Sequence, residues 1–170
     1  MAALLAVAET TGPRTSGAPL RLGFWGVEEF GLYGSRSYVR SLGRERILGI
    51  AAYLNLDMVG SRNPVRAVYG ANQSRPRARP AARRITRLLR ARVRPAETTG
   101  GASDHVPFAA AGVPVGGIFT GASARGPGGH PRDACYHLAC DRLANVSLPV
   151  LVDLARATES TLAVLSRQAK

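Results

Sequence analysis

The sequence predicts an α/β fold, a three-layer sandwich in which helices cover both faces of a mostly parallel central sheet. Two observations support this prediction. Short apolar runs typical of strands alternate with segments whose apolar residues recur at helical spacing. The run at 50–60 is also apolar on both faces, as expected for a strand between two helical layers. The chain has 170 residues, of which 45% are hydrophobic, and this suits a single domain with one core.

Four strands are predicted from apolar runs: 20–27, 50–60, 65–69 and 113–120. The second run is apolar except at Asn55 and Asp57, so it is expected at the centre of the sheet. In the last run Gly116 and Gly117 stand side by side, which indicates close approach by another backbone or by a ligand.

Five helices are predicted where apolar residues recur three or four positions apart: 2–9, 31–42, 80–93, 103–112 and 148–165. Gly43 is expected to end the second helix, because glycine readily adopts the left-handed C-cap conformation. In the fourth helix Ser103 is the expected N-cap, Asp104 a favourable charge in the first turn, and His105 a surface residue. Residues 122–143 are rich in Gly and Pro and are predicted to form a long loop.

The formal net charge is +12, from 23 basic and 11 acidic residues, and nine arginines lie between Arg75 and Arg94. A basic balance raises the question of nucleic-acid binding. The same stretch carries Ile85, Leu89 and Val93 at helical spacing, which is typical of a surface helix with one buried stripe and a solvated basic face. It contains no aromatic residue for base stacking, and the sequence holds no zinc-finger or RNP-type motif. A nucleic-acid partner is therefore not favoured.

Neither a membrane span nor a signal peptide is predicted. No run of about 20 uncharged apolar residues occurs in the sequence. The opening residues, MAALLAVAETTGPR, have an apolar segment without a basic n-region, and they are expected to begin as a short amphipathic helix.

Three carboxylates follow the predicted strands at positions suited to chemistry. Glu28 and Glu29 come directly after the strand 20–27, and Asp57 lies near the end of 50–60. The carboxyl ends of strands in an open α/β sheet face the ligand crevice, and adjacent residues point to opposite sides. One glutamate could therefore hold a metal while the other handles a proton. Two alternatives stay open: glutamates that only open the next helix, and an Asp57 satisfied by loop amides or an arginine instead of a metal.

The string CYHLACD sets His137 between Cys135 and Cys140. Two cysteines so close can pair and close a tight loop that fixes the histidine, and an even, minimal cysteine count fits an extracytoplasmic protein. A zinc ion held by Cys135, His137 and Cys140 is the alternative, although the spacing matches no common structural zinc pattern. Carboxylates and an imidazole from several strand ends suit zinc, and two-metal hydrolytic sites use such sets.

Four motifs, FWGVEEFGLYGS, AYLNLDMVGS, GGIFTGA and CYHLACD, occur in an order and at separations that resemble the bacterial secreted double-zinc aminopeptidases of the aminopeptidase Y family, the leucine-aminopeptidase type. The similarity runs from about Ala2 to the terminal helix. It implies a zinc-peptidase-like sandwich without its N-terminal strands, formed by one truncated peptidase domain over 1–170. It also implies a secreted or extracytoplasmic location and a peptide or protein substrate with a free N-terminus.

The resemblance implies how the metal site is shared among the acidic residues and the histidine. Glu28 would be the general base that takes a proton from a metal-bridging water. Glu29 and His137 would hold one zinc ion, and Asp57 would hold the second.

The resemblance also implies two residues that contact the substrate. Tyr136 would donate a hydrogen bond to the tetrahedral oxyanion. Phe119 would line the pocket for the substrate's N-terminal side chain, which is expected to be large and apolar.

The chain departs from the family pattern in ways that bear on activity. A histidine and a metal-bridging aspartate precede the first helix in the family and have no counterpart here, so two zinc ions are expected in the complete family member and at most partial occupancy here. Ala102 stands where the family has a substrate-binding arginine, and Val152 and Arg156 replace acids that bind calcium in some members. The alternative function is therefore a catalytically inactive relative that acts as a peptide-binding or interaction module. Self-association through an exposed sheet edge is also expected.

Overall fold

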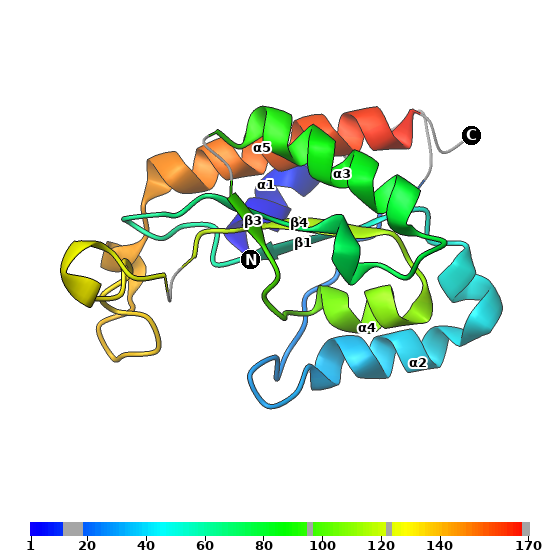
Figure 1. The fold of residues 1–170 in the computed structure, drawn as a ribbon, viewed down its shortest axis with the longest axis horizontal. Coiled ribbons are helices and arrows are strands. Elements are labelled where there is room, and N and C mark those ends of the chain that lie inside the picture. Colours follow the sequence, from blue (N-terminus) through cyan, green and yellow to red (C-terminus); the bar gives the residue numbers. More distant parts are fainter. Residues whose placement is uncertain (12–18, 95–96, 122–123, 168–170) are drawn as a thin grey trace.

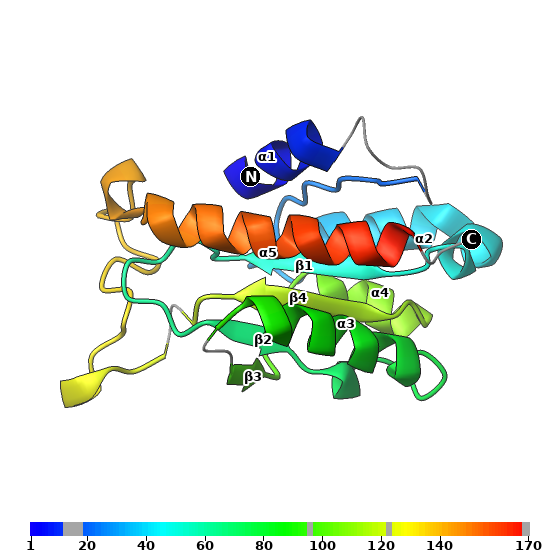
Figure 2. The ribbon, with the colours of Figure 1, turned by 90° about the horizontal axis from the view of Figure 1, so that it is seen from above.

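Helices cover both faces of a central sheet in the computed structural model (Figure 1). On one face lie α3, Arg79–Arg92, and α5, Leu148–Ser166. The other face is covered by α2, Tyr33–Leu48, and α4, His105–Ala111. The helix α1, Ala2–Thr11, packs beside α5 (Figure 2). The predicted α/β class is therefore confirmed. The structure describes residues 1–11, 19–94, 97–121 and 124–167.

The described strands form one sheet in the order β1-β4-β2-β3. Their bounds are β1 Tyr53–Asp57, β2 Ala67–Tyr69, β3 Glu97–Thr99 and β4 Val115–Phe119. β1 runs parallel to β4, and β3 runs parallel to β2, whereas β2 and β4 are antiparallel. The sheet is therefore mixed, and the prediction of parallel pairing holds for two of its three neighbouring pairs. In the β1–β4 register Asp57 lies beside Phe119, so both residues reach the same edge.

The predicted strand at 20–27 is wrong, because residues 19–28 belong to no strand. Side-chain packing on the layer of α2 and α4 holds this segment instead. The Trp25 ring centroid lies 5.0 Å from that of Tyr38 and 5.8 Å from that of Phe108, and Trp25 Nε1 donates to the Tyr53 hydroxyl at 2.9 Å. Apolar burial needs no ladder of backbone hydrogen bonds, so the apolar pattern alone could not separate this segment from a strand.

Other differences from the predicted elements are smaller. No strand is predicted at Glu97–Thr99, since its residues are all polar and give no hydrophobic signal. Gly43 has the predicted positive φ, 67°, but the chain resumes helical geometry after it and the element ends at Leu48. Short 3-10 turns occur at Ala71–Gln73, Pro127–Gly129 and Leu143–Asn145. The loop predicted after the first helix falls at 12–18, which, like residues 122–123, lies outside the described residues.

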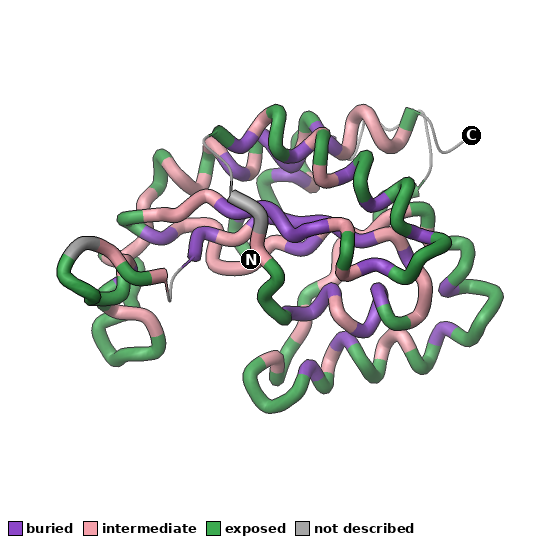
Figure 3. The backbone as a smooth tube through the Cα atoms, in the orientation of Figure 1, coloured by how far each residue is buried: buried purple, intermediate pink, exposed green. Residues whose placement is uncertain are grey.

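Two apolar clusters, one on each face of the sheet, make the core, and the most buried backbone follows the strands (Figure 3). Toward α3 and α5 the cluster contains Val68, Ile85, Leu89, Ile118 and Leu154. Toward α2 and α4 it contains Leu42, Ile47, Phe108, Val113 and Val115. Within the described part of the chain, no helix combines the length and apolarity that crossing a bilayer requires.

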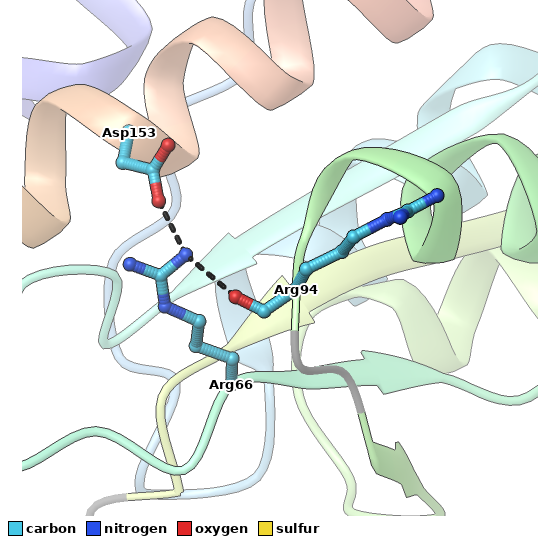
Figure 4. Close-up of polar contacts among 3 residues, drawn as sticks. All are labelled: Arg66, Arg94 and Asp153. Carbon is cyan, nitrogen blue, oxygen red and sulfur yellow. Dashed lines mark hydrogen bonds and ion pairs between the residues drawn. The ribbon is translucent and has the colours of Figure 1, made fainter.

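Arg66 joins the sheet to the two helices above it (Figure 4). This residue directly precedes β2, and its guanidinium pairs with Asp153 of α5. The same Nη1 donates to the carbonyl oxygen of Arg94, just beyond α3, at 3.2 Å. The pair is partly exposed, and such ion pairs typically contribute less than about 1 kcal/mol. Its main effect is therefore to fix the direction of these segments.

His105 is fully buried, so its prediction as a surface residue is wrong. The first turn of α4 faces the sheet, and the imidazole centroid lies 4.2 Å from that of the Tyr69 ring. His105 Nε2 lies 3.0 Å from Oε1 of Gln73, whose amide donates to the carbonyl oxygens of Gly100 and Gly101. Burial lowers the pKa of His105 from its ordinary value of 6.5 to about 4.

Acid is expected to destabilise the fold through His105. The unfolded imidazole takes up a proton near pH 6.5 and the folded one only near pH 4. The contribution of His105 to the free energy of unfolding should therefore fall by up to ~3 kcal/mol as the pH is lowered through this window. The carboxylates whose pKa is raised on folding act in the opposite direction, and they do so equally in the His105 variant. Urea unfolding at several pH values measures this effect. The free energy of unfolding should decrease less with acid in His105→Phe than in the wild type. The control His130→Phe changes an exposed histidine and should show the same decrease as the wild type. Equal curves for wild type and His105→Phe would contradict this assignment.

The paired glycines sit where the sequence predicts close approach. A Cβ added at Gly117 would lie 2.3 Å from the carbonyl oxygen of Asn55, a backbone atom of β1. Gly117→Ala is therefore expected to lower the free energy of unfolding by about 1–3 kcal/mol, since the two strands must move apart. Gly100→Ala is the matched control, because a Cβ there would meet no atom within 4 Å. Denaturant unfolding measures both, and a neutral Gly117→Ala would show that β1 and β4 can separate freely.

Candidate active site

Glu28 and Glu29 lie in a tight turn that leads into α2. The Glu28 carbonyl oxygen accepts hydrogen bonds from the amides of Gly31, at 3.0 Å, and Leu32, at 2.9 Å. Val27, directly before the acid pair, has a φ of 59°, which a β-branched residue rarely adopts. The turn leaves Glu28 half-buried and Glu29 exposed, so the two carboxylates have different surroundings.

His137 lies in a small ring of chain closed by a disulfide between Cys135 and Cys140, as predicted. The pairing of both cysteines rules out the alternative in which they bind zinc as thiolates. Oδ1 of Asp133 secures the start of the ring, since it accepts from the Cys135 amide at 3.2 Å and from the Asn145 side chain at 2.9 Å. His137 itself has a φ of 59°.

The structure brings Glu29 and His137 together from distant parts of the sequence. His137 Nε2 lies 3.3 Å from Oε1 of Glu29, and both side chains are more than half exposed. One carboxylate and one imidazole at this separation are donors of the type that zinc takes.

Asp57 ends β1, and a chain of hydrogen bonds runs along this strand to Ser103, ahead of α4. Trp25 donates to Tyr53, the Tyr53 hydroxyl donates to Oδ1 of Asn55 at 3.1 Å, and the Asn55 amide donates to Oγ of Ser103 at 3.0 Å. Burial raises the pKa of Asp57, a hydrogen bond with Ser103 counteracts this, and the charges of Asp104 and Glu29 raise it further. Met58, the next residue, has a φ of 48°.

Glu28 interacts electrostatically with the whole group. Burial is the main cause that raises its pKa, followed by the negative charges of Asp57, Glu29 and Asp104, whereas His137 lowers it. Four carboxylates therefore share one region, and their mutual repulsion would be relieved by a bound cation.

Tyr136 and Phe119 border the same region. The Tyr136 ring centroid lies 3.9 Å from that of His137, and its hydroxyl has a raised pKa because of burial and the charges of Glu29, Asp57 and Glu28. Phe119 ends β4 half-buried, with its ring 6.5 Å from that of Tyr69. Both side chains are half-buried and therefore keep part of their surface exposed.

These residues fit a zinc site in donor type and only in part in number. Among the described residues, no three His, Cys, Asp or Glu side chains come close enough to hold one metal ion. Glu29 with His137 would supply two donors for one ion, and Asp57 would supply one donor for another.

Sequence reasoning missed Asp104, which is only 8% exposed and is electrostatically coupled to Glu28 and Asp57. Its place at the start of a helix was explained by the favourable effect of a negative charge in the first helical turn. The available signal was its position between Ser103 and His105, three consecutive polar residues ahead of an apolar helix.

Comparison with known proteins places the chain in a family. The model of peptidase family M28 matches residues 1–162. The chain is 40% identical over 139 residues to leupeptin-inactivating enzyme 1 of Streptomyces exfoliatus, covering 75% of this chain and 31% of that protein. It is 37% identical over 176 aligned positions to the probable lipoprotein aminopeptidase LpqL of Mycobacterium tuberculosis, covering 89% of this chain and 35% of that protein.

Solved structures give the same result. An aminopeptidase from Aneurinibacillus sp. strain AM-1 superposes with a TM-score of 0.65 and 27% identity, over 84% of this chain and 32% of that one. A zinc aminopeptidase from Bacillus subtilis superposes with a TM-score of 0.62 and 26% identity, over 86% of this chain and 36% of that one. The chain thus spans about a third of the length of the proteins named here. With its family model matched over nearly the whole chain, the protein belongs to peptidase family M28.

Proposed function

We propose that this chain forms the part of a zinc aminopeptidase that carries the general base and ligands for both metal ions. The enzyme would remove N-terminal, large apolar residues from peptides. The observation that supports this most directly is the 3.3 Å contact between Glu29 and His137. Relatives named as aminopeptidases, and a structure named as a zinc aminopeptidase, support the same reaction class.

Glu29 and His137 would hold one zinc ion, and Asp57 would hold the other. When bound, zinc supplies Lewis-acid activation of water and of the scissile carbonyl. The Ser103 hydrogen bond would keep Asp57 oriented, and the disulfide ring would keep His137 directed at Glu29.

Glu28 would act as the general base. Burial and the neighbouring carboxylates raise its pKa, and a raised pKa favours a carboxylate that accepts a proton and returns it. It would take a proton from the attacking water and pass it to the leaving amine.

Tyr136 would donate a hydrogen bond to the oxyanion that develops on the scissile carbonyl. Burial and the neighbouring carboxylates raise the pKa of its hydroxyl, so the phenol keeps the proton that it must donate. Phe119 would line the pocket for the substrate's N-terminal side chain, because it ends β4 beside Asp57.

A second candidate function is a peptide-binding module without catalysis. It is favoured by the absence, among the described residues, of any three side chains able to hold one metal ion. Under either function we propose an extracytoplasmic location, to which the disulfide is suited. Self-association would use the free side of β1, which in the described sheet pairs only with β4.

Replacement of Glu28 separates the two functions. Glu28→Gln keeps the shape of the side chain and removes the base, so zinc-dependent hydrolysis of leucine 4-nitroanilide should fall about 100-fold or more. Binding of a fluorescent apolar peptide should stay unchanged. The control Glu45→Gln alters an exposed glutamate of α2 and should leave both measurements at wild-type values. A wild-type chain that binds peptide but hydrolyses nothing at any zinc concentration would favour the binding module.

Removal of His137 tests the metal site directly. His137→Ala should weaken zinc binding, measured by calorimetric titration, at least about tenfold, because the imidazole supplies one of two donors to that ion. His130→Ala changes an exposed histidine ahead of the disulfide ring and should bind zinc as the wild type does. Equal zinc affinity in the wild type and His137→Ala would contradict the assignment.

A further inference from the structure

Ser103, Asp104 and His105 are consecutive, and each connects α4 to a different part of the fold. Ser103 accepts a hydrogen bond from Asn55 of β1, and His105 lies beside Gln73. Asp104, between them, interacts with Ser35 in the first turn of α2. The three side chains thus fix the start of α4 against the elements that surround the proposed metal site.

Of these three residues, Asp104 is expected to destabilise the fold. The residue is only 8% exposed, and Oδ1 has no hydrogen-bond partner within the described residues. An unsatisfied, buried carboxylate oxygen destabilises a fold, typically by a few kcal/mol.

Although the chain has 23 basic residues, no ion pair among the residues that the structure describes gives Asp104 a cation. In the described residues the ion pairs are Arg66 with Asp153 and His137 with Glu29, and neither involves Asp104. The negative charge of Asp104 raises the pKa of Glu28 and of Asp57. A positive charge from outside the chain, such as a bound metal ion, would compensate the buried charge of this carboxylate.

We propose that Asp104 is a positioning carboxylate whose negative charge strengthens the binding of divalent cations by Glu29, His137 and Asp57, without being a ligand itself. This inference rests on the proposed function. Its physical basis is the long reach of Coulomb interactions at a partly desolvated site, where a fixed charge beyond the ligands still attracts the ion. The same charge makes the metal-free fold less stable than it would be with a neutral side chain.

Asp104→Asn tests both halves of the proposal on the full chain. Asparagine keeps the shape of the side chain and one acceptor oxygen, so the substitution removes little besides the charge. The dissociation constant for Co²⁺, followed by its visible absorption, should rise about 10-fold. The urea midpoint of the metal-free chain should stay at the wild-type value or rise. A purely structural role predicts the opposite pattern, with a lower midpoint and unchanged metal affinity.

Two controls separate charge from packing. Glu45→Gln makes the same change in net charge at an exposed position of α2 and should leave the Co²⁺ affinity unchanged. Ser35→Ala removes the interaction with Asp104, so it should lower the urea midpoint. It keeps the Asp104 charge, so the Co²⁺ affinity should stay near the wild-type value. A wild type that binds Co²⁺ and an Asp104→Asn variant that binds it equally well would overturn this inference alone. A wild type that binds no Co²⁺ would overturn the proposed function together with it.

Discussion

The close contact of β1 with β4 is the constraint on which the site depends. Gly117 lets β4 approach the backbone of β1 at Asn55, where a side chain would not fit. Their parallel register then sets Asp57 beside Phe119 at one edge of the sheet. Asn55 also reaches Ser103 from β1, and so determines where α4 begins. The proposed metal ligand, the proposed pocket residue and the buried carboxylate of Asp104 are thus placed by one pair of strands.

The charge distribution of the protein is uneven in a way that suits this site. The chain as a whole carries a formal charge of +12. Most of the arginines within α3 are exposed to solvent. Around Glu28 the pattern reverses, because Glu29, Asp57 and Asp104 all raise its pKa and only His137 lowers it. A local concentration of negative charge within a basic protein attracts small cations to one place. The arginines on the exposed face of α3 do not require a nucleic-acid partner. They form the solvated side of a helix whose opposite face contributes Ile85 and Leu89 to the core.

The sequence predicts the layers and most helices because hydrophobic spacing reports burial directly. It predicts the Cys135–Cys140 pairing because a separation of five residues leaves few alternatives. It fails at 20–27, where aromatic packing and not strand pairing holds the half-buried Trp25. It fails at β3, which has no apolar residue, and at His105, because one histidine beside a helix start gives no sign of which way it faces. Strand ends and residue types suggest that the carboxylates and His137 meet, but no local pattern pairs Glu29 with His137, and that pairing rests on the family resemblance.

Backbone geometry adds a different kind of information about the site. Outside glycine, the described residues with positive φ are Val27, Leu32, Met58 and His137. Val27 precedes the acid pair, Met58 follows Asp57, and His137 is itself a proposed ligand. Each such residue costs roughly 1–2 kcal/mol that a glycine would not. The backbone beside the proposed ligands is therefore strained. The packing of the two apolar clusters must be rigid enough to keep these residues in their unfavourable conformations.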